Sequence, residues 1–87
     1  MTASYKLIWK SSAERELRQL PKETIVKLLS FAETLVINPF PSGVKKMQGA
    51  QNTYRARSGN YRLIYEVNGN ELLIQIIRVG HRQDVYK

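Results

Sequence analysis

The sequence predicts an α+β fold, in the order β-α-α-β-β-β, with a helical hairpin packed on one face of a small, mainly antiparallel sheet. Two observations predict it. Residues 11–37 keep the apolar spacing of amphipathic helices, and residues 53–79 are β-prone and divided by turn dipeptides. A chain of 87 residues without an internal repeat is short enough for one domain, which we take as residues 1–87.

The N-terminal half is expected to form one strand and two helices. Residues 5–10 are short, β-prone and partly alternating, which is typical of a strand. Ser11 and Glu14 have the spacing of a capping box, so a first helix is expected after Ser11 and before Pro21. A second helix is expected from about Lys22, and the two prolines and the glycine within residues 38–43 end it.

The C-terminal half is expected to form three strands, residues 53–58, 61–67 and 71–79. Asn68-Gly69 is the strongest short-range signal for a two-residue hairpin turn, because both central residues of a type I′ turn need a positive φ. This turn would make one sheet face apolar throughout, and that face is the expected core. Its pairs would be Tyr61–Ile76, Leu63–Ile74 and Tyr65–Leu72.

The turn at Gly59-Asn60 decides where the arginines of the sheet lie. A two-residue turn places Arg55 and Arg57 on the face away from the helices, with Arg57 opposite Arg62. A three-residue loop would turn Arg55 and Arg57 into the core, at the high cost of burying unpaired charge. Like charges in direct register destabilise a sheet, so an Arg57–Arg62 pair indicates an anion site.

The charge of the chain is uneven. The total is 14 − 7 = +7; residues 1–43 contribute 6 − 4 = +2, and residues 44–87 contribute 8 − 3 = +5. The first half mixes signs as a solvated helix surface does, whereas the second concentrates arginine, whose planar fork of donors suits phosphate. The total alone is compatible with mere solubility, but its distribution favours a polyanionic partner.

Composition excludes several classes of protein. Without cysteine there is no disulfide, thiolate zinc site or cysteine nucleophile, and a single histidine cannot hold a metal, so we expect no cofactor and no metal. No run of apolar residues is long enough for a membrane span or a secretion signal. We therefore expect a cytoplasmic protein with no membrane partner.

The last part of the chain combines bases with an aromatic ring: Arg78, His81, Arg82 and Tyr86 follow closely on one another. Guanidinium groups that hold phosphate, beside a ring on which a base can stack, suit single-stranded RNA. His81 or Tyr86 alone would be weak evidence; the combination is more specific.

With these motifs the chain resembles the RelE/ParE superfamily of toxins from type II toxin–antitoxin systems, and in particular its RelE-like branch. The resemblance covers essentially the whole chain and is carried by residues 54–57, 59–65, 79–82 and 85–86. It implies a metal-independent endoribonuclease, an mRNA interferase, that inhibits translation by cutting mRNA in the ribosomal A site. The 2′-hydroxyl would attack the adjacent phosphate and leave a 2′,3′-cyclic phosphate.

The resemblance also implies roles for individual residues. Arg62 would stabilise the phosphorane, Arg82 would bind the phosphate and donate to the leaving group, and Tyr86 would stack on or orient a nucleotide. Arg57 and His81 complete the expected catalytic set. The expected RNA- and phosphate-binding residues are Arg55, Arg57, Arg78, Lys45 and Lys46.

The general base is left open. Lysines can stand in the family where this chain has Arg55 and Arg57, and arginine essentially cannot lose its proton. Histidine titrates near neutral pH, so His81 is the better candidate. If the last strand stays regular, its odd-numbered residues face Arg62 and His81 points into the site, although Gly80 can break that parity.

The expected partners are mRNA on the ribosome, with 16S rRNA contacts, and a cognate RelB-like antitoxin. An acidic, partly disordered antitoxin would be attracted to a +7 surface, at Ile64, Leu73 and Ile77 or on the outer helix surface. DNA would be contacted only indirectly, through the antitoxin complex. The alternatives are a ParE-like toxin that poisons DNA gyrase and a non-catalytic RNA-binding relative.

Overall fold

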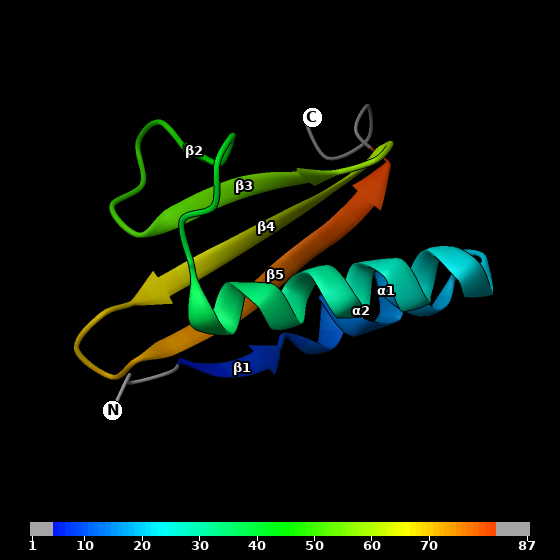
Figure 1. The fold of residues 1–87 in the computed structure, drawn as a ribbon, viewed down its shortest axis with the longest axis horizontal. Helices are drawn as coiled ribbons and strands as arrows, with labels where there is room; N and C mark the ends of the chain where they lie inside the picture. Colours follow the sequence, from blue (N-terminus) through cyan, green and yellow to red (C-terminus); the bar gives the residue numbers. More distant parts are fainter. Residues whose placement is uncertain (1–4, 82–87) are drawn as a thin grey trace.

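A computed structural model describes residues 5–81 and confirms the expected α+β fold, with both helices on one face of the sheet (Figure 1). The elements are β1 (Lys6–Trp9), α1 (Ser11–Arg18), α2 (Lys22–Ile37), β2 (Lys45–Lys46), β3 (Thr53–Ser58), β4 (Tyr61–Asn68) and β5 (Leu73–His81). They form one sheet in the order β1-β5-β4-β3-β2. β1 runs parallel to β5, and every other neighbouring pair is antiparallel.

The helices have nearly the expected bounds, but the start of α1 differs. Ser11 is already the first helical residue, Lys10 is the N-cap, and no side chain caps the helix, so the expected capping box is wrong. The Glu14 backbone N–H donates to the Lys10 carbonyl at 2.9 Å, while the Glu14 carboxylate forms an ion pair with Arg18 one turn later. The backbone therefore closes the first turn of α1 without help from a serine hydroxyl.

The core lies between the helices and one face of the sheet, called here the covered face. Its buried residues from the helices are Ala13, Leu17, Leu28, Ala32 and Leu35. Its buried residues from the strands are Ala56, Leu63, Tyr65, Val67, Ile74, Ile76 and Val79. Along β3 and β4 these residues alternate with residues of the opposite face, called here the open face.

Tyr65 ties the segment after α2 to the sheet. Its fully buried hydroxyl donates to the Pro39 carbonyl at 2.7 Å, and its ring stacks on Tyr54 with centroids 6.1 Å apart. Tyr54 in turn meets Phe40 edge-on at 5.0 Å. Burial, and secondarily the neighbouring Tyr54, raise the pKa of Tyr65 well above its ordinary value.

The β3–β4 hairpin has the expected register. Arg57 lies opposite Arg62, and Arg55 lies opposite Ile64. Gly59 has a φ of 61°, the left-handed conformation that a tight hairpin turn requires and that glycine adopts without a Cβ clash. The two-residue turn at Gly59-Asn60 is therefore confirmed, and with it the position of these arginines on the open face.

The β4–β5 hairpin differs from expectation at its turn. Asn68 stays in β4 opposite Leu73, and residues 69–72 form a four-residue loop in place of a two-residue turn. The Glu71 backbone N–H donates to Asn68 Oδ1 at 3.0 Å, and Leu72 takes a φ of 53°. As a result Tyr65 lies opposite Ile76, and Leu72, expected in the core, is 36% exposed.

A β-bulge in β5 changes which residues face the open side. Ile64 lies opposite Arg78 while the next residue, Tyr65, lies opposite Ile76, so Ile77 has no direct partner on β4. Beyond the bulge, Gly80 lies opposite Arg62 and His81 lies opposite Tyr61. The expectation that His81 points toward Arg62 is therefore wrong, because the bulge reverses the parity on which it depended.

The free edge of β5 is closed by α1. β1 pairs only with residues 73–76 of β5, so the strand beyond them lacks a neighbour on that side. There the Val79 N–H donates to Glu16 Oε1 at 3.0 Å, and Arg78 donates to Glu16 Oε2 at 3.3 Å. One helix carboxylate thus replaces the missing strand and fixes the end of β5.

Candidate functional site

The open face carries basic residues in two neighbouring cross-strand rows. In one row Arg57 lies opposite Arg62, which lies opposite Gly80. The other row runs across β2, β3, β4 and β5 and consists of Lys45, Arg55, Ile64 and Arg78. Like charges side by side repel one another, so the arrangement is stabilised when an anion binds between them.

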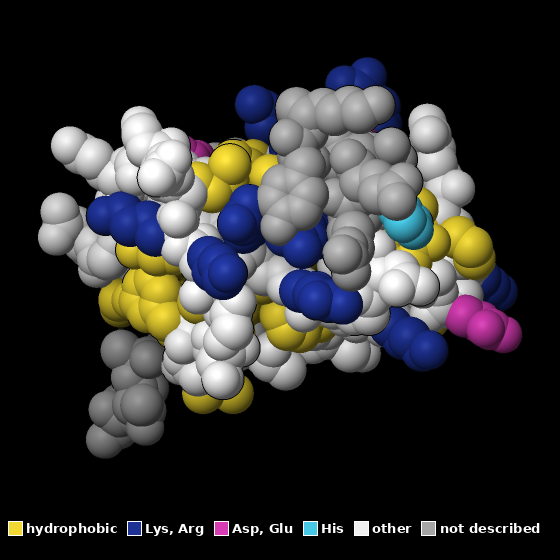
Figure 2. Space-filling model, turned by 90° about the horizontal axis from the view of Figure 1, so that it is seen from above, with side chains coloured by type: hydrophobic (Ala, Val, Ile, Leu, Met, Phe, Trp, Pro, Cys, Tyr) yellow, Lys and Arg dark blue, Asp and Glu magenta, His cyan; other side chains and the backbone are white. Residues whose placement is uncertain are grey.

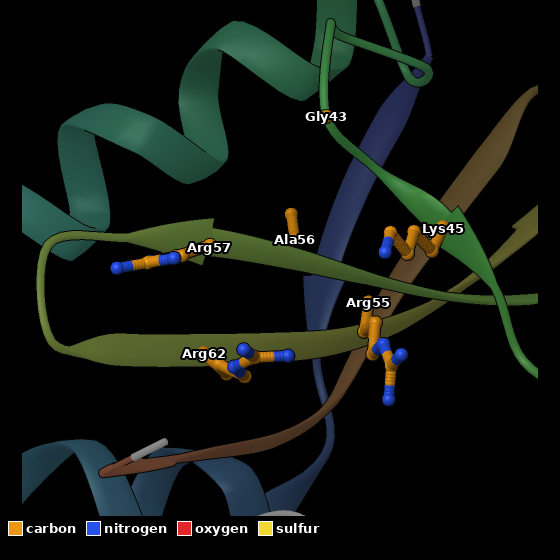
Figure 3. A pocket seen from close by; sticks show the side chains of 6 residues that line it. All are labelled: Gly43, Lys45, Arg55, Ala56, Arg57 and Arg62. Atoms are coloured by element: carbon orange, nitrogen blue, oxygen red, sulfur yellow. The ribbon is translucent and has the colours of Figure 1, made fainter.

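Four of these bases line one hollow of about 130 Å³, together with Gly43 and Ala56 (Figure 3). The four are Lys45, Arg55, Arg57 and Arg62, and no acidic residue joins them in the lining. At about 30 Å³ per water molecule, the hollow has room for roughly four waters, or for a small anionic group such as a phosphate. We call it the basic hollow.

The side chains enter the basic hollow from three strands. Figure 3 shows the Lys45 and Arg62 side chains directed toward the middle of the group, while the Arg55 side chain extends downward in the view, away from Lys45. Arg57 runs along β3 toward the hairpin turn, where its Nε donates to the Gly59 carbonyl at 3.4 Å. Arg55 and Arg62 are half-buried and the other two are exposed. Partial burial lowers the local dielectric constant and strengthens the attraction to an anion.

Lys45 reaches the basic hollow through β2, an element that the sequence did not predict. After the prolines of residues 39–41, Gly43 takes a φ of 89° and the Val44 N–H donates to the Pro41 carbonyl at 3.2 Å. The chain then pairs with β3, with Lys45 opposite Arg55 and Lys46 opposite Tyr54. Only Lys45 is therefore on the side of the arginines, and Lys46 is not part of the lining.

The other expected site residues are not brought into the basic hollow. Arg78 shares its row but forms an ion pair with Glu16 of α1. His81 contacts the Tyr61 ring, with centroids 5.8 Å apart, on the covered face. Arg82 and Tyr86 lie outside the described residues. Within residues 5–81, no three His, Cys, Asp or Glu side chains are grouped to hold a metal ion.

Basic side chains dominate the surface around the site. Figure 2 shows Lys and Arg side chains gathered in the middle of the surface that carries β2 and β3, with few acidic ones in view. None of the helices within the described part of the chain is long and apolar enough to cross a membrane. The basic side chains on this surface offer a polyanion an anchoring point on the sheet.

Comparison with known proteins identifies the family to which the chain is similar. Residues 7–86 match the family model described as "ParE toxin of type II toxin-antitoxin system, parDE". The chain is 31% identical over 84 residues to Toxin RelG of Mycobacterium tuberculosis. The matched region covers 95% of this chain and 97% of the relative.

Solved structures agree. The toxin–antitoxin complex RelBE2 of Mycobacterium tuberculosis matches with a TM-score of 0.82 and 29% identity, over 94% of this chain and 95% of that one. The archaeal RelE–RelB complex of Pyrococcus horikoshii matches with a TM-score of 0.80 and 33% identity, over 94% of this chain and 97% of that one. The family match over residues 7–86, the identity to a named toxin and the similarity of fold agree, and the chain belongs to the RelE/ParE superfamily of type II toxins.

Proposed function

We propose that this toxin is a ribosome-dependent mRNA endoribonuclease that cuts mRNA in the ribosomal A site. The basic hollow carries the proposal, because four cationic side chains line a space of phosphate size there. A toxin that acts only by binding another protein has no need of such a cluster of cations. The relatives named RelE and RelG support the same assignment by similarity.

The proposed reaction is an in-line attack of a ribose 2′-hydroxyl on the adjacent phosphate. The 2′-oxygen forms a new bond to phosphorus as its hydroxyl releases a proton, and the bond to the 5′-oxygen then breaks as that oxygen takes up a proton. These changes leave a 2′,3′-cyclic phosphate and a free 5′-hydroxyl. Negative charge grows on the equatorial oxygens of the phosphorane between these two events. Arg62 and Arg55, half-buried and fixed on neighbouring strands, stabilise that charge in the transition state.

The basic hollow supplies positive charge that stabilises and positions the phosphate, and it contributes less to proton transfer. Three of its four bases are arginines, which essentially do not release a proton. His81 lies against Tyr61 on the covered face and is poorly placed to act as the base. We therefore propose that stabilisation of charge dominates and that the ribosome orients the RNA for attack. The roles of Arg82 and Tyr86 in phosphate binding and base stacking stay predictions.

A cognate antitoxin is part of the proposal. Several similar structures are complexes of RelE with RelB, in bacteria and in archaea. An acidic antitoxin segment would be attracted to the excess positive charge of this chain and would neutralise it. A toxin that is active on ribosomes works in the cytoplasm.

The test is translation in a purified system, followed by primer extension on the message. The wild-type toxin should produce cuts within codons held in the A site, and addition of the antitoxin should suppress them. Gyrase-dependent breaks in DNA with an intact message would instead favour the ParE-like alternative. The matching family model is named after ParE toxins, so this alternative is included in the test. An intact message and intact DNA, with RNA still bound, would indicate a non-catalytic relative.

A further inference from the structure

The last part of β5 is held differently from its first part. Residues 73–76 have a strand on each side, because β1 pairs with them on one side and β4 on the other. After the bulge at Ile77, residues 78–81 keep only β4 as a neighbouring strand. A β-bulge bends a strand and increases its twist, so the paired part of β5 before the bulge does not fix the direction of residues 78–81.

Glu16 of α1 lies on the side of β5 where a neighbouring strand is missing. Its Oε1 accepts the Val79 backbone N–H at 3.0 Å, and its Oε2 accepts a hydrogen bond from Arg78 at 3.3 Å. The bond to Val79 is the tighter constraint, because its donor is a backbone group with one fixed direction. The ion pair with Arg78 is partly exposed and is screened by solvent. Glu16 therefore holds the backbone of β5 at one point beyond the bulge.

The backbone that Glu16 holds adjoins the basic hollow. Val79 and Gly80 are consecutive in β5, and Gly80 lies directly opposite Arg62, which lines the hollow. A shift of the backbone at Val79 would therefore move the part of β5 that pairs with Arg62. β5 ends at His81, and the next residue in the chain is Arg82, which is predicted to bind the phosphate and lies outside the described residues.

The effect of Glu16 on a bound phosphate is unfavourable in charge. Glu16 pairs with Arg78, which shares a cross-strand row with Arg55 of the basic hollow. A carboxylate at this end of the row reduces the attraction of the surface to an anion. Any favourable contribution of Glu16 to the site is therefore geometric and not electrostatic.

α1 carries two glutamates, on opposite flanks of its buried stripe. The stripe consists of Ala13 and Leu17, and at 3.6 residues per turn Glu14 and Glu16 lie on either side of it. Glu14 forms an ion pair with Arg18 of its own helix, whereas Glu16 reaches β5. Both side chains are partly exposed, so Glu14 is a matched control for Glu16.

We propose that Glu16 is a positioning residue for RNA cleavage, which holds the end of β5 beside Arg62 through the Val79 N–H. The proposal rests on the proposed function for its reaction. A displacement of about 1 Å at a reacting centre can cost roughly 100-fold in rate, even when the altered residue lies far from the chemistry. The contact would therefore act on the rate of cutting and not on the affinity for ribosomes.

The first test compares Glu16→Ala with Glu14→Ala in single-turnover cutting of a message on programmed ribosomes, well below the melting temperature of each variant. Glu16→Ala should lower the rate constant at saturating toxin by roughly 10- to 100-fold. The toxin concentration that gives half of this rate should change by less than about three-fold, because no contact with the substrate is lost. Glu14→Ala loses a carboxylate and an ion pair from the same helix, and it should stay within about two-fold of the wild type.

Glu16→Gln separates the hydrogen bond from the charge. Its amide oxygen can still accept the Val79 N–H, whereas the ion pair with Arg78 is lost. The rate constant should therefore return to within about three-fold of the wild type. A rate as low as that of Glu16→Ala would assign the effect to the charge and overturn the proposal.

Amide hydrogen exchange tests the contact without any nuclease activity. In Glu16→Ala the Val79 amide should exchange roughly ten-fold faster or more, while the amides of residues 73–76 keep their wild-type rates. Glu14→Ala should change neither. Unchanged exchange at Val79 in Glu16→Ala would overturn the proposal, because the carboxylate would then not hold the strand.

The outcomes separate this proposal from the proposed function. If the wild type cuts messages and Glu16→Ala cuts them equally fast, the positioning role is overturned and the nuclease stands. An equal loss in Glu14→Ala would also overturn the positioning role, because a general effect on α1 would then explain the result. A wild type that cuts no message would reject the proposed function, and the positioning role would fall with it.

Discussion

The two faces of the sheet show how neighbouring residues of one strand meet opposite demands. Leu63 is fully buried on the covered face, while the residue before it, Arg62, lines the basic hollow on the open face. Full burial of a leucine contributes about 1.5–3 kcal/mol. A pair of like charges in register costs at most about 1 kcal/mol. The covered face therefore sets the register, and the open face can hold repelling charges without losing it.

This comparison predicts that changes on the two faces have separable consequences. Variants on the covered face should change the free energy of unfolding and leave the activity of each folded molecule intact. Variants in the basic hollow should do the reverse.

Leu63→Ala should destabilise the fold by about 2–5 kcal/mol, the cost of lost burial plus a cavity in a packed core. Urea denaturation measures it. A domain of this size has little stability to spare, so a large unfolded fraction is expected at 37 °C. A loss below about 1 kcal/mol would contradict the assignment of Leu63 to the centre of the core.

Arg62→Ala should reduce the rate of message cleavage by roughly 100- to 1,000-fold, the usual effect of removing one donor to a developing oxyanion. Single-turnover cutting on programmed ribosomes measures it. The free energy of unfolding should change less than in Leu63→Ala. Arg62→Lys keeps the charge but loses the planar fork, so its cleavage rate should lie between those of the wild type and Arg62→Ala. Unchanged cutting by the alanine variant would remove Arg62 from the site.

Tyr65→Phe should cost about 1–3 kcal/mol, because the buried Pro39 carbonyl loses its donor. The raised pKa of Tyr65 adds a pH signature. Its contribution is fully present below the ordinary tyrosine value of about 10 and is lost as the pH rises above it, because the unfolded chain then releases the proton more readily. The wild type should lose stability above about pH 10 more steeply than the variant, and equal slopes would contradict this.

Lys45→Ala should reduce cutting by about ten-fold, since an exposed ammonium is partly screened by solvent. Lys45→Arg should stay within about three-fold of the wild type, because charge and not proton transfer is the proposed contribution. Lys46→Ala is the matched control; Lys46 is the next residue of β2 and lies outside the lining. A large loss in Lys45→Arg would instead assign Lys45 a role in moving a proton.

The sequence was most informative where two constraints agreed. Along β3 and β4, the period of two and the cost of burying Arg55 and Arg57 allowed only one turn length, and the register at Gly59-Asn60 is confirmed. The helices were equally predictable, since their apolar period and the prolines that flank α2 agree. These elements place three of the four bases of the basic hollow.

The remaining features depend on contacts that no local pattern encodes. Asn68-Gly69 suggested a two-residue turn, but the Asn68 side chain caps a longer loop, and Leu72 accepts a left-handed conformation that a non-glycine residue rarely adopts. β2 is two residues long, which is too short to show any period. The sequence therefore predicted Lys45 as a phosphate-binding residue but not the strand that positions it. The bulge at Ile77 has no sequence signature either, and it moved His81 to the covered face.

The proposed reaction requires the 2′-hydroxyl beside the cut phosphate as its nucleophile. A message in which that single ribose is replaced by 2′-deoxyribose, compared with the all-ribose message on the same ribosomes, therefore tests the central claim most directly. We expect wild-type toxin to cut the all-ribose message at one A-site position and to leave the substituted message intact there. Equal cutting of both messages would contradict the mechanism, and cutting of neither would contradict the function.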